Sequence, residues 1–274
     1  MNSNAIIVEA GKSQKQYWKD LWSYRELFYF MAWRDIIVRY KQTVIGILWS
    51  ILRPLLTMLV LTIVFGKWAK MPSDGTPYPI LVFTALLPWQ LFSNSFTGAS
   101  NSLILNPNLI SKVYFPRVVL PTSSVVVSLV DFLLSFLILL CLMFWYKFWP
   151  SWRLLYLPLL ILLATTVSLA AGLWISALNV KYRDFRYIIP FVVQFGLYIS
   201  PVGFSSSVVP DKWRLLYSLN PMVGVIDGFR YSVLANNVHF YMPGFLLSII
   251  LVVFLFVTGF MYFRNTERTF ADVI

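Results

Sequence analysis

Few residues of this sequence combine the types and the spacing that catalysis or metal binding requires. The chain has one histidine, His239, and one cysteine, Cys141, whereas a zinc site takes several side-chain ligands. Asp131 is the only acidic residue deep within an apolar stretch, so a carboxylate pair for acid–base catalysis lacks its second member there. The sequence contains neither a GxxxxGK[ST] motif nor a glycine-rich loop for a nucleotide. It therefore favours a conduit or a scaffold over an enzyme, with no metal or cofactor bound by this chain.

Two charged residues within apolar stretches still require an explanation. An acid in hydrocarbon faces a partner or water, so Asp131 either hydrogen-bonds to a Ser, an Asn or a backbone group of a neighbouring helix or lies on a transport path. Arg53 lies roughly 10 Å beyond Gly46 along a helix. Its guanidinium could reach the inner headgroups by snorkelling, or it could bind a lipid-linked phosphate, whose geometry it matches.

The composition is that of an integral membrane protein. Of the 274 residues, 59% are hydrophobic, 18% are aromatic and only 12% are charged, which does not describe a soluble surface. The formal net charge is +11. The basic residues lie mostly beside the apolar stretches, which favours an explanation by membrane topology over a nucleic-acid-binding patch. The first residues lack the features of a signal peptide, so we expect the first span to insert the chain.

The apolar stretches predict an all-α polytopic membrane protein that forms a single domain, residues 1–274. About 20 apolar residues suffice to cross roughly 30 Å of hydrocarbon as a helix. Residues 44–204 contain five such stretches and residues 241–264 contain a sixth, so six transmembrane helices are expected at about 44–65, 80–105, 122–146, 154–178, 187–204 and 241–263. The fifth is barely long enough, and Pro190, Gly196 and Pro201 interrupt it. Residues 265–274 form a polar tail.

Within residues 1–43, an amphipathic helix is expected before the first span. At 100° per residue, one side carries aromatic and aliphatic residues and the other side carries the charges. The apolar side consists of Tyr29, Phe30, Trp33, Ile36, Ile37 and Tyr40, and the charged side of Arg34, Asp35, Arg39 and Lys41. Such a helix lies in the plane of the membrane interface.

The second span is unusually rich in small and polar residues, a composition that allows close helix packing in lipid. These residues are Ser93, Asn94, Ser95, Thr97, Gly98, Ser100 and Asn101.

Residues 205–240 predict two short helices, neither of which is long enough to cross a bilayer. Asn220 is a plausible N-cap of the second, with Pro221 at its first position. We therefore expect a re-entrant or surface hairpin. With six spans both termini lie on one side, and most of the 22 Lys and Arg residues then share that side, which predicts cytoplasmic termini.

Four ordered blocks resemble a known family. They are WRDIIVRYKQTVIGILWSILRPLLTMLVLTIVFG, NPNLISKVYFPRVVLP, NVKYRDFRYIIPFVVQ and LNPMVGVIDGFRYSVL. Together they are similar to the transmembrane subunits of type-2 ABC exporters of lipid-linked polysaccharides, such as O-antigen, capsule and teichoic-acid exporters, over about residues 20–264. In that family a glutamine often stands at the position of Arg53.

The resemblance implies a bacterial inner-membrane permease without its own ATPase site. Two copies would form the pore, and two separate ABC ATPase subunits would bind ATP and Mg²⁺ beneath it. The substrate would be a long glycan on a carrier of the undecaprenyl-pyrophosphate type, passing through an aromatic-lined channel among membrane lipids. The interfacial helix would correspond to about residues 22–43, the coupling helix to about 108–117 and the periplasmic gate helices to 205–240.

The resemblance also suggests roles for particular residues. Coupling to the ATPase would involve a compact protrusion, Leu109, Lys112, Tyr114, Phe115, Pro116 and Arg117. Access of the lipid pyrophosphate would involve Arg34, Arg39, Tyr40, Lys41 and Arg53. The channel and gate would involve Phe92, Phe96, Asp131, Tyr198, Asp227 and Arg230.

Simpler interpretations stay open for each set. The protrusion could be a plain cytoplasmic turn, the basic residues could serve only as positive-inside anchors, and aromatic residues within spans could face lipid or pack. Two other functions also remain: a type-2 exporter of drugs or lipids, and a polytopic enzyme of lipid-linked sugar metabolism. The enzyme would need clustered acids or histidines at one membrane face. Asp35 and Asp184 with their basic neighbours are the nearest such set, and they give this function little support.

Overall fold

The protein folds as a bundle of helices. The computed structural model describes residue 17 and residues 21–41, 44–73, 75–234 and 240–270, with the backbone alone for 44–47. Within these ranges every regular element is a helix, in the order α2 (Arg25–Lys41), α3 (Val44–Leu61), α4 (Tyr78–Asn101), α5 (Pro107–Lys112), α6 (Val119–Trp145), α7 (Leu157–Lys181), α8 (Phe185–Ile199), α9 (Asp211–Tyr217), α10 (Pro221–Val233) and α11 (Met242–Thr266). The predicted all-helical class is confirmed.

Among the residues that the structure describes, five helices are long and apolar enough to cross a membrane, and they match five of the predicted spans. The first is α3 with the π-helical segment that follows it (Leu48–Trp68), and the second and third are α4 (Tyr78–Asn101) and α6 (Val119–Trp145). The last two are α7 with the 3₁₀ turn before it (Trp152–Lys181) and α11 with the 3₁₀ turn after it (Met242–Thr269). The predicted fifth span corresponds to α8, which has 15 residues and ends at Ile199. It covers only about 22 Å at 1.5 Å per residue. Pro201 explains this end, since the residue before a proline is disfavoured in a helix.

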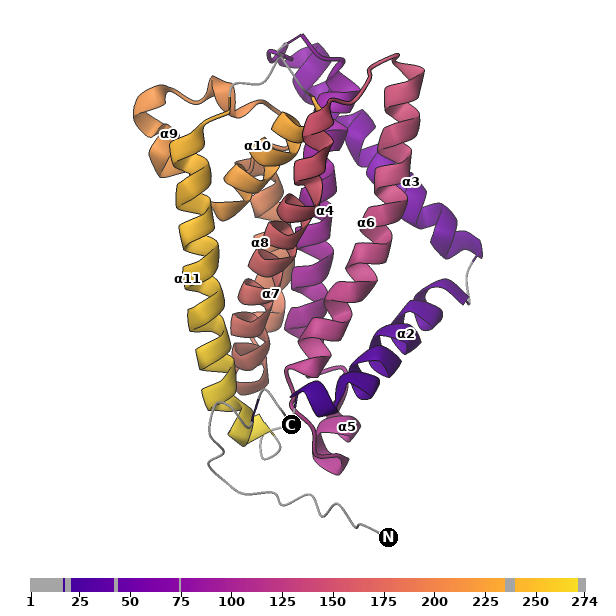
Figure 1. Ribbon diagram of the computed structural model, residues 1–274, viewed down its shortest axis with the longest axis vertical. Coiled ribbons are helices and arrows are strands. Elements are labelled where there is room, and N and C mark those ends of the chain that lie inside the picture. Colours follow the sequence, from indigo (N-terminus) through magenta and orange to yellow (C-terminus); the bar gives the residue numbers. More distant parts are fainter. Residues whose placement is uncertain (1–16, 18–20, 42–43, 74, 235–239, 271–274) are drawn as a thin grey trace.

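α4 is the central helix of the bundle, and α3, α6, α7, α8 and α10 pack around it (Figure 1). Its first half is apolar except for Thr84 and is buried from Ile80 to Trp89. Its second half carries the small polar residues noted in the sequence, of which Ser95 and Ser100 are completely buried. Small side chains let neighbouring helices approach closely in lipid.

A close helix contact joins α4 to α7. A Cβ atom added to Gly172 would lie 2.5 Å from the Cβ of Ala99, so the two backbones approach more closely than any larger pair would allow. α8 approaches α4 in the same way, because a Cβ at Gly196 would lie 2.6 Å from the Trp89 ring. These contacts set the distances of α7 and α8 from the central helix.

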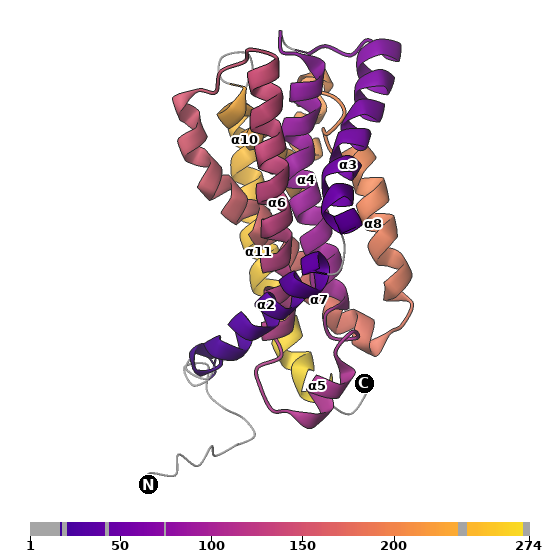
Figure 2. The same ribbon diagram turned by 90° about the vertical axis from the view of Figure 1, so that its right-hand side faces the viewer.

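The two ends of the bundle differ. At the end that we call the base, α2 begins, α11 ends and α5 protrudes, whereas α9 and α10 form a hairpin at the opposite end (Figures 1 and 2). The two short helices and the Asn220 cap are as predicted, because the Asn220 side chain accepts a hydrogen bond from the Met222 N–H at 3.0 Å. α5 is shorter than the predicted coupling helix of 108–117. Val113 is extended, and Pro116 disfavours a helix before it.

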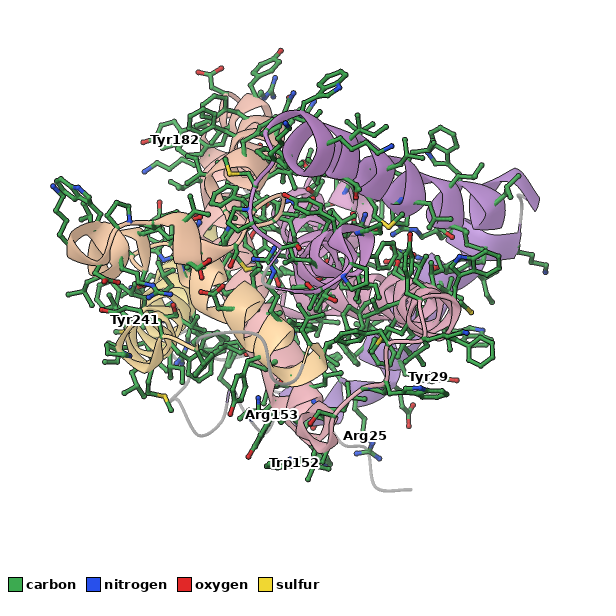
Figure 3. All side chains as sticks on the ribbon, turned by 90° about the horizontal axis from the view of Figure 1, so that it is seen from above. Arg25, Tyr29, Trp152, Arg153, Tyr182 and Tyr241 are labelled. Carbon is green, nitrogen blue, oxygen red and sulfur yellow. The ribbon has the colours of Figure 1, made fainter. Side chains whose placement is uncertain are left out.

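α2 lies across the base at an angle to the bundle (Figure 2). Its aromatic side faces away from the protein, with Tyr29, Phe30 and Trp33 all more than half exposed. Tyr29, like Trp152 of the 3₁₀ turn before α7 and Tyr182 after it, lies at the periphery of the bundle (Figure 3). A helix is present where the amphipathic helix was predicted, but its buried residues are Met31 and Ala32, which are not on the predicted apolar side. Tyr40 and Arg39, predicted for opposite sides, both contact Asp131 of α6.

Candidate substrate pathway

A cavity of about 1010 Å³ opens between α3, α4, α6 and α8, with the end of α2 beside it. Its wall includes aromatic, amide, hydroxyl and charged side chains. The residues used below are Arg39, Tyr40, Trp49, Arg53, Trp89, Gln90, Ser93, Asn94, Thr97, Asn101, Asp131, Arg186 and Gln194. We call this space the α3–α8 cavity.

One face of α4 supplies most of the neutral polar wall. Gln90, the adjacent pair Ser93 and Asn94, Thr97 and Asn101 follow one another at intervals of three or four residues, which places them on the same side of a helix. The polar residues of this span thus fall into two sets. Ser95 and Ser100 are buried among the helices, and the five residues named above line the cavity. The sequence pattern indicated close packing but not this second role.

Aromatic rings complete the wall, with Trp49 on α3 and Trp89 on α4. Trp49 is more than half exposed and Trp89 is nearly buried. An aromatic ring can contact the C–H face of a sugar while amide and hydroxyl groups bond to its hydroxyls. The cavity therefore offers both kinds of surface that a polysaccharide presents.

Asp131 lies on the cavity wall with partners from two other helices. Arg39 Nη2 of α2 is 2.7 Å from its Oδ2, the Tyr40 hydroxyl donates to its Oδ1, and Asn94 Nδ2 of α4 donates to Oδ2 at 3.4 Å. The pKa of the Tyr40 hydroxyl is raised above its ordinary value, mainly by burial and further by this hydrogen bond to Asp131. The hydroxyl therefore stays protonated as a donor. The predicted requirement for a hydrogen-bonding partner on a neighbouring helix is met.

Positive charge on the cavity wall exceeds negative charge. Arg53 of α3 and Arg186 of α8 line the cavity with Arg39, against the single acid Asp131. In the part of the chain that the structure describes, no ion pair involves Arg53 or Arg186. Arg186 was not among the predicted site residues. The sequence feature that could have indicated Arg186 is the basic loop NVKYRDFR, which ends with Arg186 directly before the apolar part of α8.

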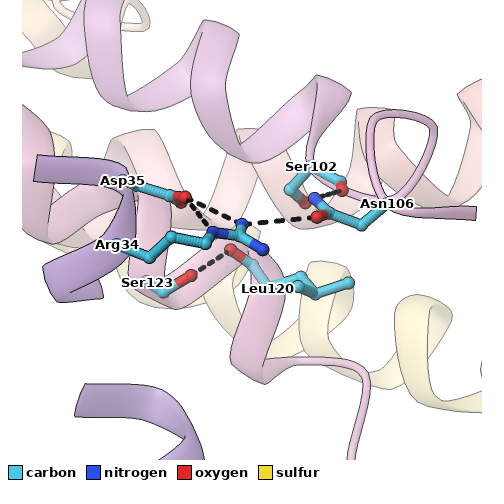
Figure 4. A network of polar contacts seen from close by, with 6 residues as sticks. All are labelled: Arg34, Asp35, Ser102, Asn106, Leu120 and Ser123. Atoms are coloured by element: carbon cyan, nitrogen blue, oxygen red, sulfur yellow. Dashed lines mark hydrogen bonds and ion pairs between the residues drawn. The ribbon is translucent and has the colours of Figure 1, made fainter. Parts of the chain in front are cut away.

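Two basic residues predicted to lie with Arg39 and Arg53 do not reach the cavity wall. Lys41 is exposed at the end of α2. Arg34 bonds to Asp35 at 2.8 Å and to Asn106 Oδ1 at 3.3 Å, and Asn106 in turn donates to the Ser102 carbonyl at 2.9 Å (Figure 4). Arg34 thus joins α2 to the start of α5.

The aromatic residues predicted for the channel lie outside the cavity wall. Phe92 and Phe96 are buried in the core and stack on each other with centroids 5.6 Å apart. Tyr198 is 58% exposed on the outer side of α8. Phe191 and Phe195 are also exposed and stack at 5.3 Å. α8 therefore presents an aromatic outer face next to the cavity.

Arg230 and Asp227, both predicted for the gate, are buried in α10. Arg230 donates to the carbonyls of Phe204 at 2.8 Å and Val202 at 3.2 Å. The same loop is bound by the Tyr78 hydroxyl, which donates to the Gly203 carbonyl at 2.7 Å. These contacts fix the loop after α8 to the hairpin and to the start of α4.

The predicted protrusion divides into exposed and anchored residues. Lys112 and Tyr114 are exposed and Leu109 is half-buried, whereas Phe115 and Pro116 are buried. Arg117 is partly buried, and its backbone N–H donates to Glu267 Oε1 at 2.6 Å. The protruding surface of this segment is thus its first part, up to Tyr114.

Comparison with known proteins identifies the family of this chain. Residues 26–234 match the profile of the ABC-2 type transporter family. The chain is 31% identical over 258 residues to the O-antigen export system permease protein RfbA of Myxococcus xanthus, covering 93% of this chain and 98% of the relative. It is 27% identical to the protein of the same name from Klebsiella pneumoniae, covering 88% and 92%. The polysialic acid transport protein KpsM of Escherichia coli is 23% identical, covering 86% and 91%. This chain is a multi-helix membrane bundle that matches the profile over most of its length. It therefore belongs to the ABC-2 type transporter family.

Proposed function

We propose that this chain is the permease subunit of an ATP-driven exporter that moves a lipid-linked polysaccharide across the bacterial inner membrane. The observation that carries this proposal is the α3–α8 cavity, whose wall combines tryptophan rings with a row of amide and hydroxyl groups. The names of the relatives, O-antigen export and polysialic acid transport, support the same substrate class.

The chemistry of the cavity separates this function from its closest alternative. A permease for drugs or lipids would favour a wall of aliphatic side chains, because apolar ligands bind in mostly apolar pockets. Here Gln90, Asn94, Asn101 and Gln194 face the cavity. An apolar ligand would remove these amides from water without replacing their hydrogen bonds to it, which costs binding energy. A wall of this kind suits a ligand with many hydroxyl groups.

The carrier lipid would supply the charge that the cavity favours. Arg53 and Arg186 line the cavity from different helices, and a guanidinium matches phosphate geometry. We therefore assign the pyrophosphate of an undecaprenyl-type carrier to these two residues, with Arg39 and Tyr40 beside them. Arg34 and Lys41 would act farther out, at the membrane surface.

A six-pass topology is consistent with this role. In the described part of the chain, five helices are long enough to cross. The sixth crossing would be made by α8 with the loop to Phe204, which would leave α9 and α10 as a re-entrant hairpin on the outer side. The base, with α2 and α5, would then face the cytoplasm. This orientation places the basic end of α2 and the NVKYRDFR loop inside.

ATP and Mg²⁺ would be bound by two copies of a separate ABC ATPase that contacts α5 and the loop after it. Purified alone, the chain should show no ATPase activity, and the complex with its partner should hydrolyse ATP. Hydrolysis by the isolated chain would overturn this division of labour.

A second copy of the chain would complete the pathway. The outer face of α8 exposes Phe191, Phe195 and Tyr198 beside the cavity. In a two-fold dimer, a residue near the axis lies close to its own copy. We expect Tyr198→Cys, in a Cys141→Ser background, to cross-link as a dimer in membranes, whereas Leu159→Cys on the exposed side of α7 should not. Equal cross-linking at both positions would argue against this interface.

Deletion of the gene in its native host tests the function directly. Loss of export should remove the polysaccharide from the cell surface and leave lipid-linked glycan inside the cell, and the intact gene should reverse both effects. A synthetic enzyme would instead leave no completed lipid-linked glycan, and a drug or lipid exporter would leave the surface polysaccharide unchanged.

A further inference from the structure

The segment between α4 and α6, residues 106–117, is held to other elements at both of its ends. At its start, Arg34 of α2 bonds to Asn106 (Figure 4). At its end, the backbone N–H of Arg117 donates to the carboxylate of Glu267, in the 3₁₀ turn that follows α11. We call residues 106–117 the base segment.

Glu267 makes more than one contact with its surroundings. One carboxylate oxygen accepts the Arg117 N–H at 2.6 Å, and the other accepts the Tyr17 hydroxyl at 3.2 Å. The backbone carbonyl of Glu267 also accepts a hydrogen bond from the Arg117 guanidinium. A charged acceptor that bonds to a backbone N–H is among the stronger hydrogen bonds. Glu267 therefore joins the base segment to both the N-terminal part of the chain and α11.

An apolar cluster supports the same junction. Phe115 is buried together with Phe263 of α11 and Phe270 beyond it, and the last two rings meet edge to face at 5.4 Å. In contrast, Val113 and Tyr114 are about half exposed. The base segment thus presents a free surface before Phe115 and is fixed to the end of α11 after it.

α11 leads from this junction to the hairpin at the opposite end of the bundle (Figure 1). Thr258 accepts a hydrogen bond from Trp174 of α7 at 3.3 Å. Farther along α11, Ser248 lies so close to α10 that a Cβ added to Gly224 would be 2.4 Å from its hydroxyl. A helix packed this tightly at both ends transmits a displacement as a rigid element.

We infer that Glu267 is a positioning residue that joins the base segment to α11, so that movement of the segment reaches the hairpin. This inference rests on the proposed function, because a partner ATPase would supply the movement through the exposed residues up to Tyr114. Glu267 itself is only half-buried and acts through Arg117 and α11.

The test compares Glu267→Ala with Glu267→Gln in the full-length chain. Alanine removes the acceptor for the Arg117 N–H, whereas the glutamine amide oxygen keeps it. Arg268→Ala is the matched control, because Arg268 is exposed in the same turn. Hydrogen exchange at the Arg117 amide is measured in the purified chain, and ATP hydrolysis and polysaccharide export are measured for the complex with its ATPase.

With Glu267→Ala we expect exchange at the Arg117 amide to rise about tenfold and export to fall about tenfold, while the complex still assembles and hydrolyses ATP. Glu267→Gln should restore both quantities, and Arg268→Ala should resemble the wild type. A parallel loss of export, hydrolysis and assembly, or unchanged export with Glu267→Ala, would overturn the inference.

The outcome also separates this inference from the proposed function. A spin label on α10 reports movement of the hairpin during ATP hydrolysis. If the wild-type complex exports no polysaccharide, the substrate assignment fails. The positioning role still stands if Glu267→Ala accelerates hydrogen exchange at the Arg117 amide and uncouples ATP hydrolysis from movement of the label.

Discussion

Asp131 shows how one buried charge determines the local structure around the cavity. It is the acceptor for two consecutive residues of α2, Arg39 and Tyr40, and for Asn94 of α4. The carboxylate is nearly buried whereas the Arg39 side chain is 46% exposed, so solvent screens this ion pair in part. Its main effect is to fix the end of α2 against the bundle beside the cavity.

Asp131→Asn is therefore expected to loosen α2 without unfolding the spans. The amide keeps an acceptor for Tyr40 but loses the ion pair, which should cost about 1 kcal/mol of local stability. Hydrogen exchange of residues 36–41 should increase severalfold, and exchange in α4 and α7 should not change.

Asp211→Asn provides the control, because it breaks an ion pair with Arg214 in which the aspartate is almost fully exposed. Exchange in α2 that is equally fast in both variants, or unchanged in Asp131→Asn, would contradict this role for Asp131.

At the same scale, Arg230 illustrates a residue whose role the sequence could not reveal. It is 1% exposed, and it donates hydrogen bonds to two backbone carbonyls more than 25 positions earlier in the chain. Backbone carbonyls carry no sequence signal, so composition and spacing indicated only an arginine in a short helix. The same holds for Arg117, whose contact with Glu267 crosses 150 positions.

Replacing Arg230 by methionine should destabilise the hairpin. Two buried carbonyls would lose their donor, at about 1–2 kcal/mol each, and thermal unfolding in nanodiscs should occur several degrees lower. Arg230→Lys keeps a charged donor group but only one nitrogen to reach the two carbonyls, so it should be intermediate, and Lys212→Met on the exposed side of α9 should be neutral. Equal stability of Arg230→Met and the wild type would show that the hydrogen bonds of Arg230 to the loop after α8 do not stabilise the hairpin.

At the scale of elements, the central position of α4 follows from its small residues. A helix that is apolar on all sides is expected in a core, and Ala99 and Ser100 let α7 approach it closely. The sequence predicted five of the long helices and the presence of a helix before the first span, because these depend on the local pattern of apolar residues. It did not predict which α4 residues face the cavity, since that depends on where α7 packs.

Gly172→Ala tests this packing. The added Cβ would lie 2.5 Å from the Cβ of Ala99, so α4 and α7 must separate, at a cost of about 1–3 kcal/mol. The double variant Ala99→Gly with Gly172→Ala should recover most of the lost stability, as measured by thermal unfolding in nanodiscs. Additive destabilisation in the double variant would show that this contact does not set the helix distance.

At the scale of the whole molecule, the cavity and the base segment lie in different parts of one bundle. The cavity is bounded by α3, α4, α6 and α8, whereas the base segment is joined to α2 and α11. α2 contacts both, through Arg34 at the base segment and Arg39 at Asp131. A movement imposed at the base can therefore reach the cavity through α2 and the hairpin through α11.

The central claim is that polysaccharide passes along the α3–α8 cavity, and one substitution tests it most directly. Thr97 is exposed on the cavity wall, so Thr97→Trp should fill the cavity without disturbing the core, whereas Leu159→Trp adds the same bulk on the exposed outer side of α7. Surface polysaccharide is measured in cells that express each variant at equal levels. We expect Thr97→Trp to abolish export and to accumulate lipid-linked glycan inside the cell, with Leu159→Trp at wild-type levels; normal export by Thr97→Trp would contradict the claim.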